Sequence, residues 1–326
     1  MNQETSGKIN IKNICLCLAI PGLLASTILT ITGCLGQVHR YFELTSHFKV
    51  KYLIINFIVL ILLLVARRKS WLFVCLFCLT INGFEVLPWY GVNIANKTSE
   101  VHLKILLANV HTKNQRYSEF ISLVKQERPD VVVVEEIDKI GTTELAAIHA
   151  LFPYRFLKPR FDNFGIGIYS YIPLDNLEVK SVGEYDIPTL IADIKLQEHV
   201  VSLIATHPLP PVSQEYFYWR NQQLAEISDR VQQLKNKPVI VVGDLNTTMW
   251  SPYYRKFIRD SGLKNGRSGF GVQPTWPVDA PIFSIPLDYC LVSPEIKVID
   301  SRVGKDIGSD HYPLITELDY AIGNCS

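Results

Sequence analysis

Two segments, Gly243-Asp244-Leu245-Asn246 and Ser309-Asp310-His311-Tyr312-Pro313, decide how this chain of 326 residues is interpreted. The first follows a valine-rich run at 239–242, and by itself such a segment is often a turn whose Asp and Asn bond their own backbone. A further acidic residue, Glu136, follows another apolar run at 131–134. Polar side chains that repeatedly follow buried strands predict a site at the ends of those strands.

Outward from these segments, the second part of the chain alternates strand-like and helical patterns. Strand-like runs lie at 101–110, 131–134, 165–170, 189–194, 200–205, 239–242, 287–292, 297–303 and 314–317. Helical spacing of apolar residues occurs at 117–128, 216–234 and 252–260. Short apolar strands separated by amphipathic helices predict a layered α/β domain whose sheets are buried under helices.

The first ninety residues have a different character. Apolar stretches occur at about 11–35, 50–66 and 71–90, and a helix of about 20 apolar residues crosses the hydrocarbon core of a bilayer. The first stretch is too long for a cleaved signal peptide, and further stretches follow it. We therefore expect a transmembrane anchor at 1–92, a polar linker at 93–100 and, at 101–326, the α/β domain that carries the predicted site.

The topology depends on the number of spans. Lys8 and Lys12 precede the first stretch and Arg67-Arg68-Lys69 follows the second, which places both on the cytoplasmic side by the positive-inside rule. Three spans then put the C-terminal domain on the extracytoplasmic face of an inner membrane. The third stretch contains Asn82 and Glu85, and with only two spans the domain stays in the cytoplasm.

Charge and cysteine content restrict the function classes. Residues 1–100 carry nine Lys and Arg against four Asp and Glu, whereas residues 101–326 carry 23 against 27. An acidic domain argues against a nonspecific nucleic-acid binder, which normally presents a basic face. Five of the seven cysteines lie in the first ninety residues, and no disulfide framework or zinc spacing is visible.

The polar residues at strand ends suit phosphate-ester hydrolysis. That reaction requires a hard divalent cation, a positioned water and a donor to the developing charge. Mg²⁺ prefers oxygen ligands and keeps several waters, so one or two carboxylates and an amide suffice. The candidates are Asn109, Glu136, His207, Asp244, Asn246, Asp288, Asp310 and His311.

The segments that carry these residues resemble the endonuclease/exonuclease/phosphatase superfamily between Asn109 and Pro313. The matching segments are Leu107-Ala108-Asn109-Val110, Pro129-Asp130-Val131 before Glu136, Thr206-His207-Pro208, Gly243-Asp244-Leu245-Asn246, Leu287-Asp288-Tyr289 and Ser309-Asp310-His311-Tyr312-Pro313. With its apolar N-terminal stretches, the chain is similar to the membrane-anchored bacterial branch that contains YafD-like and vancomycin/teicoplanin-resistance-type proteins. One departure is Glu135, where the family usually has Gln.

The resemblance implies a four-layer α/β-sandwich of the DNase I-like type, preceded by the α-helical transmembrane anchor. It also implies a Mg²⁺ site, which Mn²⁺ can also fill. Glu136 would be the principal ligand, chosen over its neighbour Glu135 by its spacing to Ile137. Asn109 would lie beside it, and Asp310 would contribute to the same site or to a second ion.

The resemblance further assigns the catalytic groups. Asp244 would orient or deprotonate the attacking water, and Asn246 would hold a phosphoryl oxygen. His311 would donate to the phosphoryl oxygen, with Asp288 as the carboxylate that orients it. His207 would be a second phosphate contact or the acid for the leaving group.

Two neighbouring residues are weaker candidates. Asp162, in the loop before the run at 165–170, is either a carboxylate that orients His207 or a solvated loop acid. Trp276 is a candidate for lining the substrate cleft, although an aromatic residue in a loop more often serves packing.

We therefore expect a membrane-anchored hydrolase of phosphoesters or pyrophosphates whose substrate is a lipid phosphate, because tethering raises the local concentration of lipid-borne substrate. One alternative is a tethered nuclease acting on nucleic acid, which requires a cationic groove. Candidates for that groove are scattered: Lys158, Arg160, Arg220, Lys264 and Arg267. The other alternative is a catalytically silent lipid-binding resistance protein, but none of the expected site residues is missing.

Overall fold

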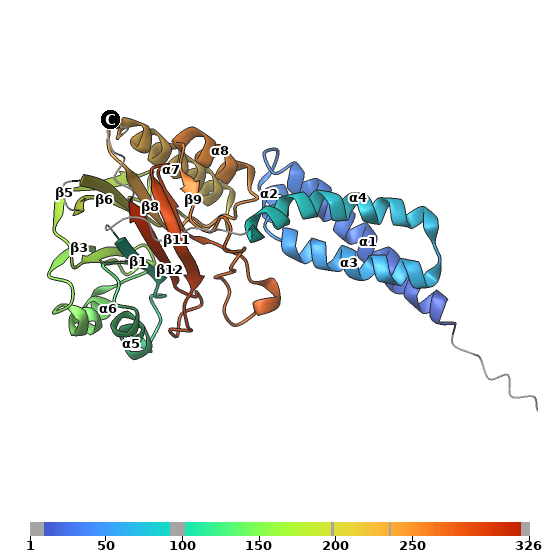
Figure 1. Cartoon of the computed structure of the whole chain (residues 1–326), viewed down its shortest axis with the longest axis horizontal. Coiled ribbons are helices and arrows are strands. Elements are labelled where there is room, and N and C mark those ends of the chain that lie inside the picture. Colours follow the sequence, from blue (N-terminus) through green and yellow to red (C-terminus); the bar gives the residue numbers. More distant parts are fainter. Residues whose placement is uncertain (1–9, 92–101, 197–198, 235, 321–326) are drawn as a thin grey trace, which may run out of the picture. The chain divides into compact units, whose positions relative to one another are not determined.

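The computed structural model describes residues 10–91, 102–196, 199–234 and 236–320. The chain divides into two compact units, Met1–Pro88 and Trp89–Ser326, and each is described by itself (Figure 1). The expected linker at 93–100 lies outside the described residues.

In the described part of the N-terminal unit, the regular elements are all helices. They are α1 (Ile11–Cys34), α2 (Arg40–Ser46), α3 (Lys49–Ala66) and α4 (Lys69–Val86), and the 3-10 helix η1 (Leu87–Tyr90) crosses the boundary between the units. Three helical stretches, Ile11–Cys34, Arg40–Ala66 and Lys69–Tyr90, are long and apolar enough to cross a membrane. The short helix α2 was not anticipated from the sequence.

Polar side chains in these helices face one another. The Ser26 hydroxyl donates to Asn56 Oδ1 at 3.0 Å, and Asn82 Nδ2 donates to Thr30 Oγ1 at 3.0 Å. Both asparagines are buried. Because hydrogen bonds between helices satisfy groups that are costly to expose to lipid, Asn82 is compatible with a span by α4.

The C-terminal unit contains two six-stranded sheets. The first has the order β11-β12-β1-β2-β4-β3 and the second β5-β6-β7-β8-β10-β9. The first sheet is made of β1 (His102–Asn109), β2 (Val131–Glu135), β3 (Tyr154–Lys158), β4 (Ile166–Ser170), β11 (Ile296–Val303) and β12 (Leu314–Tyr320). The second is made of β5 (Leu174–Val182), β6 (Ile187–Leu196), β7 (His199–Thr206), β8 (Val239–Asp244), β9 (Lys264–Asn265) and β10 (Asp288–Val292).

Helices cover the outer faces of both sheets, as Figure 1 shows. On the first sheet lie α5 (Tyr117–Glu127), α6 (Lys139–Glu144) and the 3-10 helix η2 (Leu145–Ile148). On the second lie α7 (Gln214–Gln233) and α8 (Pro252–Ser261), while the short 3-10 helix η3 (Pro281–Phe283) precedes β10. The arrangement is a four-layer α/β-sandwich, which confirms the expected fold class.

The main core lies between the sheets. Alternate residues of each strand point into it because side chains alternate along a strand, as Val201, Leu203 and Ala205 of β7 illustrate. On the other face of the first sheet, Leu106 and Val132 pack with Phe120 of α5. Both faces are buried, which explains why the central strands are continuously apolar in the sequence.

The topology brings the polar strand ends together. Asn109 at the end of β1 pairs in register with Glu135 at the end of the parallel strand β2. In the second sheet, Asp244 at the end of β8 pairs with Asp288 at the start of the antiparallel strand β10. The Glu135 carboxylate accepts the Asp244 backbone N–H, so the two sheets meet at these ends.

Two adjacent valines of β7 test the placement of the core. Val201 is fully buried between the sheets, whereas Val200 is partly exposed. We expect Val201→Ala to lower the free energy of unfolding by about 2 kcal/mol, since it removes buried methyl groups and leaves a cavity. The matched variant Val200→Ala should change it by less than about 0.5 kcal/mol. Urea denaturation of the full chain in detergent, followed by tryptophan fluorescence, measures both, and equal losses would contradict this assignment.

Candidate active site

Asn109 and Glu136 lie side by side where β1 and β2 end. Asn109 Nδ2 donates to Glu136 Oε1 at 3.0 Å, and the Thr112 hydroxyl donates to the Glu136 carbonyl at 3.1 Å. Glu136 adopts a left-handed backbone conformation (φ 56°) directly after β2. Its side chain is 14% exposed, whereas that of Glu135 is completely buried. Glu136 is therefore the carboxylate of this pair that solvent and ligands reach.

The Gly-Asp-x-Asn segment forms a turn that also builds the site. Asp244 Oδ1 accepts the Asn246 backbone N–H at 2.8 Å, and Asn246 Nδ2 donates to the Pro208 carbonyl at 2.9 Å. Gly243 is required because a Cβ there would lie 1.8 Å from the Thr206 carbonyl oxygen. The turn thus holds the Asp244 carboxylate against the loop that follows β7.

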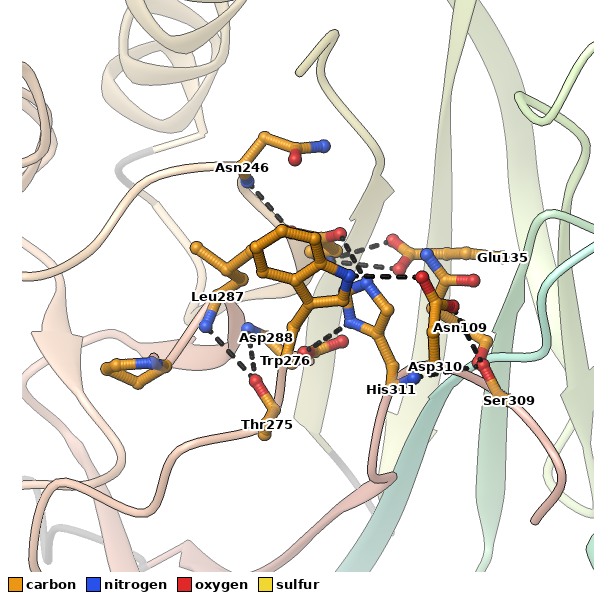
Figure 2. A network of polar contacts seen from close by, with 12 residues as sticks. Asn109, Glu135, Asn246, Thr275, Trp276, Leu287, Asp288, Ser309, Asp310 and His311 are labelled. Carbon is orange, nitrogen blue, oxygen red and sulfur yellow. Dashed lines mark hydrogen bonds and ion pairs between the residues drawn. The ribbon is translucent and has the colours of Figure 1, made fainter. Parts of the chain in front are cut away.

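His311 and Asp288 form a buried pair. His311 Nδ1 lies 3.0 Å from Asp288 Oδ2, and His311 Nε2 lies 3.6 Å from Asp244 Oδ2. The Ser309 hydroxyl fixes the segment by donating to the Asn109 carbonyl at 2.7 Å and accepting the His311 backbone N–H. Figure 2 shows the His311 imidazole between the Asp288 carboxylate and the side chains from β1 and β2. The structure therefore brings together the histidine and the carboxylate that the sequence suggested as partners.

Charges around His311 set its protonation state. Burial lowers its pKa, but the Asp288 and Asp244 carboxylates outweigh burial and raise the pKa to about 10. For Asp288, burial raises the pKa, but the attraction of His311 dominates and lowers it below its usual value. Burial raises the pKa of Asp244. The site thus holds a charged His311–Asp288 pair beside a carboxylate with increased affinity for a proton.

A second histidine lies beside a carboxylate on the other side of Asp244. His207 Nδ1 is 3.6 Å from Glu135 Oε2 and 3.9 Å from Asp244 Oδ2, and His207 Nε2 is 4.0 Å from Glu136 Oε1. Burial lowers the pKa of His207, but these carboxylates raise it to about 9. Both oxygens of Glu135 also lie 3.1 Å from the Asp244 backbone nitrogen. Glu135 therefore links His207 to the backbone that carries Asp244.

The expected partner of His207 was wrong. Asp162 forms an ion pair with Arg160, whose Nε lies 2.9 Å from Asp162 Oδ1. Among the described residues, the carboxylates near His207 are those of Glu135, Asp244 and Glu136. A loop acid was a plausible partner from sequence order, but Asp162 is neutralised within its own loop.

Asp310 and Trp276 meet at the solvent-exposed edge of the site. Trp276 Nε1 donates to Asp310 Oδ2 at 3.0 Å, and the Val278 backbone N–H donates to the Asp310 carbonyl at 3.0 Å. The side chain of Asp310 is 40% exposed, and His111 Nδ1 lies 3.8 Å from its Oδ1. Trp276 thus contacts a candidate metal ligand directly, in addition to any role in packing (Figure 2).

The donor set suits a hard cation. Glu136, Asn109 and Asp310 present carboxylate and amide oxygens without a thiolate, which fits Mg²⁺ or Mn²⁺ better than zinc. In the part of the chain that the structure describes, no group of three His, Cys, Asp or Glu side chains is arranged to hold a metal alone. Two carboxylates and an amide are a donor set that suits Mg²⁺, an ion that keeps several waters in its coordination shell.

Arg220 supports the site in a way that the sequence did not reveal. It is completely buried on α7, its Nη1 donates to the Asn246 carbonyl at 3.0 Å, and its guanidinium lies 5.3 Å from the Phe217 ring centroid. Arg220 thus supports the turn that carries Asn246. Arg267 is buried as well. The sequence suggests both as parts of a cationic surface groove, and their burial excludes that role.

The His311–Asp288 pair makes a prediction about pH. The folded-state pKa of His311 is raised from 6.5 to about 10. The contribution of the pair to the free energy of unfolding is therefore complete below about pH 6.5 and is lost as the pH rises to about 10. Asp288→Asn removes the nearest negative charge and should lower the His311 pKa, as measured by imidazole NMR of the full chain. The control Asp193→Asn, which disrupts a carboxylate paired with Lys237, should leave this pKa unchanged. An unaltered His311 pKa in Asp288→Asn would refute the pairing.

Two substitutions separate the contributions of Glu135. Glu135→Ala leaves the buried Asp244 N–H without an acceptor and should cost about 1–3 kcal/mol of unfolding free energy. Glu135→Gln keeps an acceptor oxygen and should stay within about 1 kcal/mol of the wild type, while lowering the pKa of His207. Denaturation and imidazole NMR of the full chain measure these effects, and equal destabilisation by both substitutions would count against the bond to Asp244.

Comparison with known proteins agrees with this architecture. Residues 99–311 match the model of the Endonuclease/Exonuclease/phosphatase family. The human Nocturnin catalytic domain with bound sulfate is similar, with a TM-score of 0.58 and 15% identity over 69% of this chain and 96% of that one. A humanized D. rerio TDP2 is similar with a TM-score of 0.57 and 16% identity, over 67% of this chain and 99% of that one. An endonuclease/exonuclease/phosphatase from Beutenbergia cavernae has a TM-score of 0.56 and 18% identity, over 68% of this chain and 72% of that one.

At such low identities the solved structures support the fold alone, and a comparison with curated proteins gives no match. The family model, however, covers well over half of the chain. The protein therefore belongs to the endonuclease/exonuclease/phosphatase family, whose members are generally metal-dependent phosphoesterases.

Proposed function

We propose that this protein is a membrane-anchored, Mg²⁺-dependent hydrolase of a phosphoester or pyrophosphate carried by a membrane lipid. The observation that supports this most strongly is the convergence on Asp244 of two histidines. His311 lies 3.6 Å and His207 3.9 Å from the same carboxylate oxygen. A carboxylate with increased proton affinity between two cationic donors suits attack by water on a phosphate.

The metal would be held by Glu136 and Asn109, with Asp310 contributing from the opposite loop. When bound, Mg²⁺ supplies neutralisation of the negative charge on the phosphoryl oxygens. Glu136 is suited to this role because its carboxylate is accessible, and Asn109 Nδ2 orients it at 3.0 Å.

The remaining groups act on the water and the phosphate. Asp244 orients the attacking water and accepts its proton, which the raised pKa of this carboxyl favours. The Asn246 amide contacts a phosphoryl oxygen. His311, held as an imidazolium by Asp288, donates to the phosphoryl group, and His207 donates to a second oxygen or to the leaving group.

The N-terminal helices support a membrane location. Three helical stretches are long and apolar enough to span a bilayer, which is the organisation of the membrane-anchored bacterial branch. With Lys12 and the Arg67-Arg68-Lys69 loop in the cytoplasm, an odd number of spans places the catalytic domain on the extracytoplasmic side of the inner membrane.

The lipid substrate is favoured over nucleic acid by charge. A nuclease requires a cationic groove that follows the backbone phosphates. Two of the five candidate cations, Arg220 and Arg267, are buried, and Arg160 is paired with Asp162. The two remaining candidates, Lys158 and Lys264, do not form a groove. Tethering, by contrast, raises the local concentration of a substrate in the bilayer.

Hydrolysis by the full chain in lipid vesicles tests the proposal. We expect Mg²⁺-dependent release of phosphate, or cleavage, from a lipid pyrophosphate or phospholipid, and little cleavage of DNA. Asp244→Ala and His311→Ala should each reduce kcat by about a hundredfold or more, because each removes a group that acts on the transition state. The control Asp260→Ala, on the outer surface of α8, should retain activity.

The outcomes distinguish the alternatives. Preferential cleavage of DNA would replace the lipid hydrolase with a nuclease. Absence of metal-dependent turnover of every substrate would favour a catalytically silent lipid-binding protein. Activity that survives Asp244→Ala would contradict the assignment of the site.

A further inference from the structure

Exposed apolar side chains of the C-terminal unit concentrate around the active site. Among its described residues, the large side chains without a polar atom that are most exposed are Ile140 (69%), Phe161 (92%), Val212 (72%), Ile282 (74%) and Phe283 (62%). The next is Leu177, at 49%. Such residues scattered singly need no explanation, but a group of them on one surface marks an interaction site.

The sheet topology places these residues at one end of the α/β-sandwich. Ile140 follows β2, which ends at Glu135, and Phe161 follows β3, which ends at Lys158. These two strand ends lie at the same edge of the sheet because Lys158 and Glu135 both pair with Ile166 of β4. Val212 follows β7, which runs parallel to β8. Ile282 and Phe283 precede β10, which begins opposite Asp244. All five therefore belong to segments that leave the strand ends carrying the site.

Contacts tie three of these loops directly to site residues. The Phe164 ring, in the loop of Phe161, lies 5.7 Å from the His207 ring centroid. The Pro208 carbonyl, in the loop of Val212, accepts from Asn246. Trp276, at the start of the loop that holds Ile282 and Phe283, donates to Asp310. We call Phe161, Val212, Ile282 and Phe283 the apolar rim.

The occupant of this rim follows from the rest of the chain. Three stretches are apolar enough to span a membrane, and eleven residues separate Tyr90 from His102. A chain of that length reaches at most about 40 Å, so stretches that span a bilayer would tether the C-terminal unit to that bilayer. Aromatic and aliphatic side chains on a surface beside a bilayer partition into its interface.

We propose that the apolar rim inserts into the surface of the lipid bilayer, so that the active site opens directly onto lipid headgroups. This inference rests on the proposed membrane-anchored function and adds to it how the substrate is reached. A phosphate at the headgroup level would then meet Asp244 and His311 without leaving the membrane.

Photocrosslinking of the full chain tests insertion independently of activity. We would replace Phe283 or Val212 with p-benzoylphenylalanine in protein reconstituted into vesicles of phosphatidylcholine and phosphatidylglycerol. Val200 serves as the matched position because it lies on β7 at the end opposite His207. We expect lipid adducts at 283 and 212 to exceed those at 200 by about tenfold, since only the rim enters the interface.

Kinetics of rim variants supply the second measurement. Val212→Ser and the double variant Ile282→Ser/Phe283→Ser should lower kcat/KM for a lipid-borne substrate by about tenfold and leave hydrolysis of soluble bis(p-nitrophenyl) phosphate unchanged. The control Val200→Ser should alter neither.

The two proposals fail separately. Lipid hydrolysis with equal adducts at 283, 212 and 200 would overturn the rim and leave the proposed hydrolase intact. Lipid adducts at the rim without hydrolysis of any lipid phosphate would retain the rim and overturn the substrate. Covalent dimers of the chain in place of lipid adducts would show that the rim binds a second copy, which also overturns insertion.

Discussion

The structure depends on the balance of buried charge at the meeting point of its two sheets. Glu135, Asp244 and Asp288 are almost completely buried, and a buried carboxylate is costly unless it is paired and hydrogen-bonded. Two histidines provide the compensation, His207 beside Glu135 and His311 beside Asp288. The same charges that stabilise this end of the sandwich keep both imidazoles protonated at neutral pH, so the requirement for stability and the requirement for chemistry coincide.

Much of this arrangement is predictable from sequence, for physical reasons. The central strands are apolar on both faces, so their existence is clear from the sequence, whereas their order within the sheets was not predicted. Asn109, Asp244 and Asp288 lie at strand ends that the topology brings to one edge. The edge strands β3 and β5 were missed because they are half-exposed and carry charged residues such as those of Leu174–Val182, which lack a continuous apolar pattern.

Side-chain direction is harder to predict. Glu135 and Glu136 are adjacent, yet the pleat of β2 directs Glu135 into the molecule while the left-handed turn releases Glu136 toward solvent. Because sequence order does not show that Glu135 points toward His207, it suggested Asp162 as the carboxylate partner of that histidine. In the structure Asp162 is paired with Arg160. Arg220 resembled a surface cation because nothing in the helical pattern shows that it lies beneath the Asn246 turn.

The substitution of Glu for the usual Gln at position 135 now has a structural context. The Glu135 carboxylate accepts the Asp244 backbone N–H and adds a negative charge beside His207. Asp288 supplies the corresponding negative charge beside His311. The site thus contains two histidine–carboxylate pairs on either side of Asp244, and each pair joins the two sheets: Glu135 of β2 with His207 after β7, and Asp288 of β10 with His311 before β12. Metal binding at Glu136 would add positive charge close to His207 and relieve the excess of carboxylates.

The most direct test of this account is anomalous diffraction from crystals of the full chain grown with Mn²⁺ and phosphate. The account predicts a Mn²⁺ peak beside Glu136 and Asn109, with phosphate within hydrogen-bond distance of His311 and Asn246. A peak elsewhere on the protein, or phosphate bound away from Asp244 and His311, would contradict it.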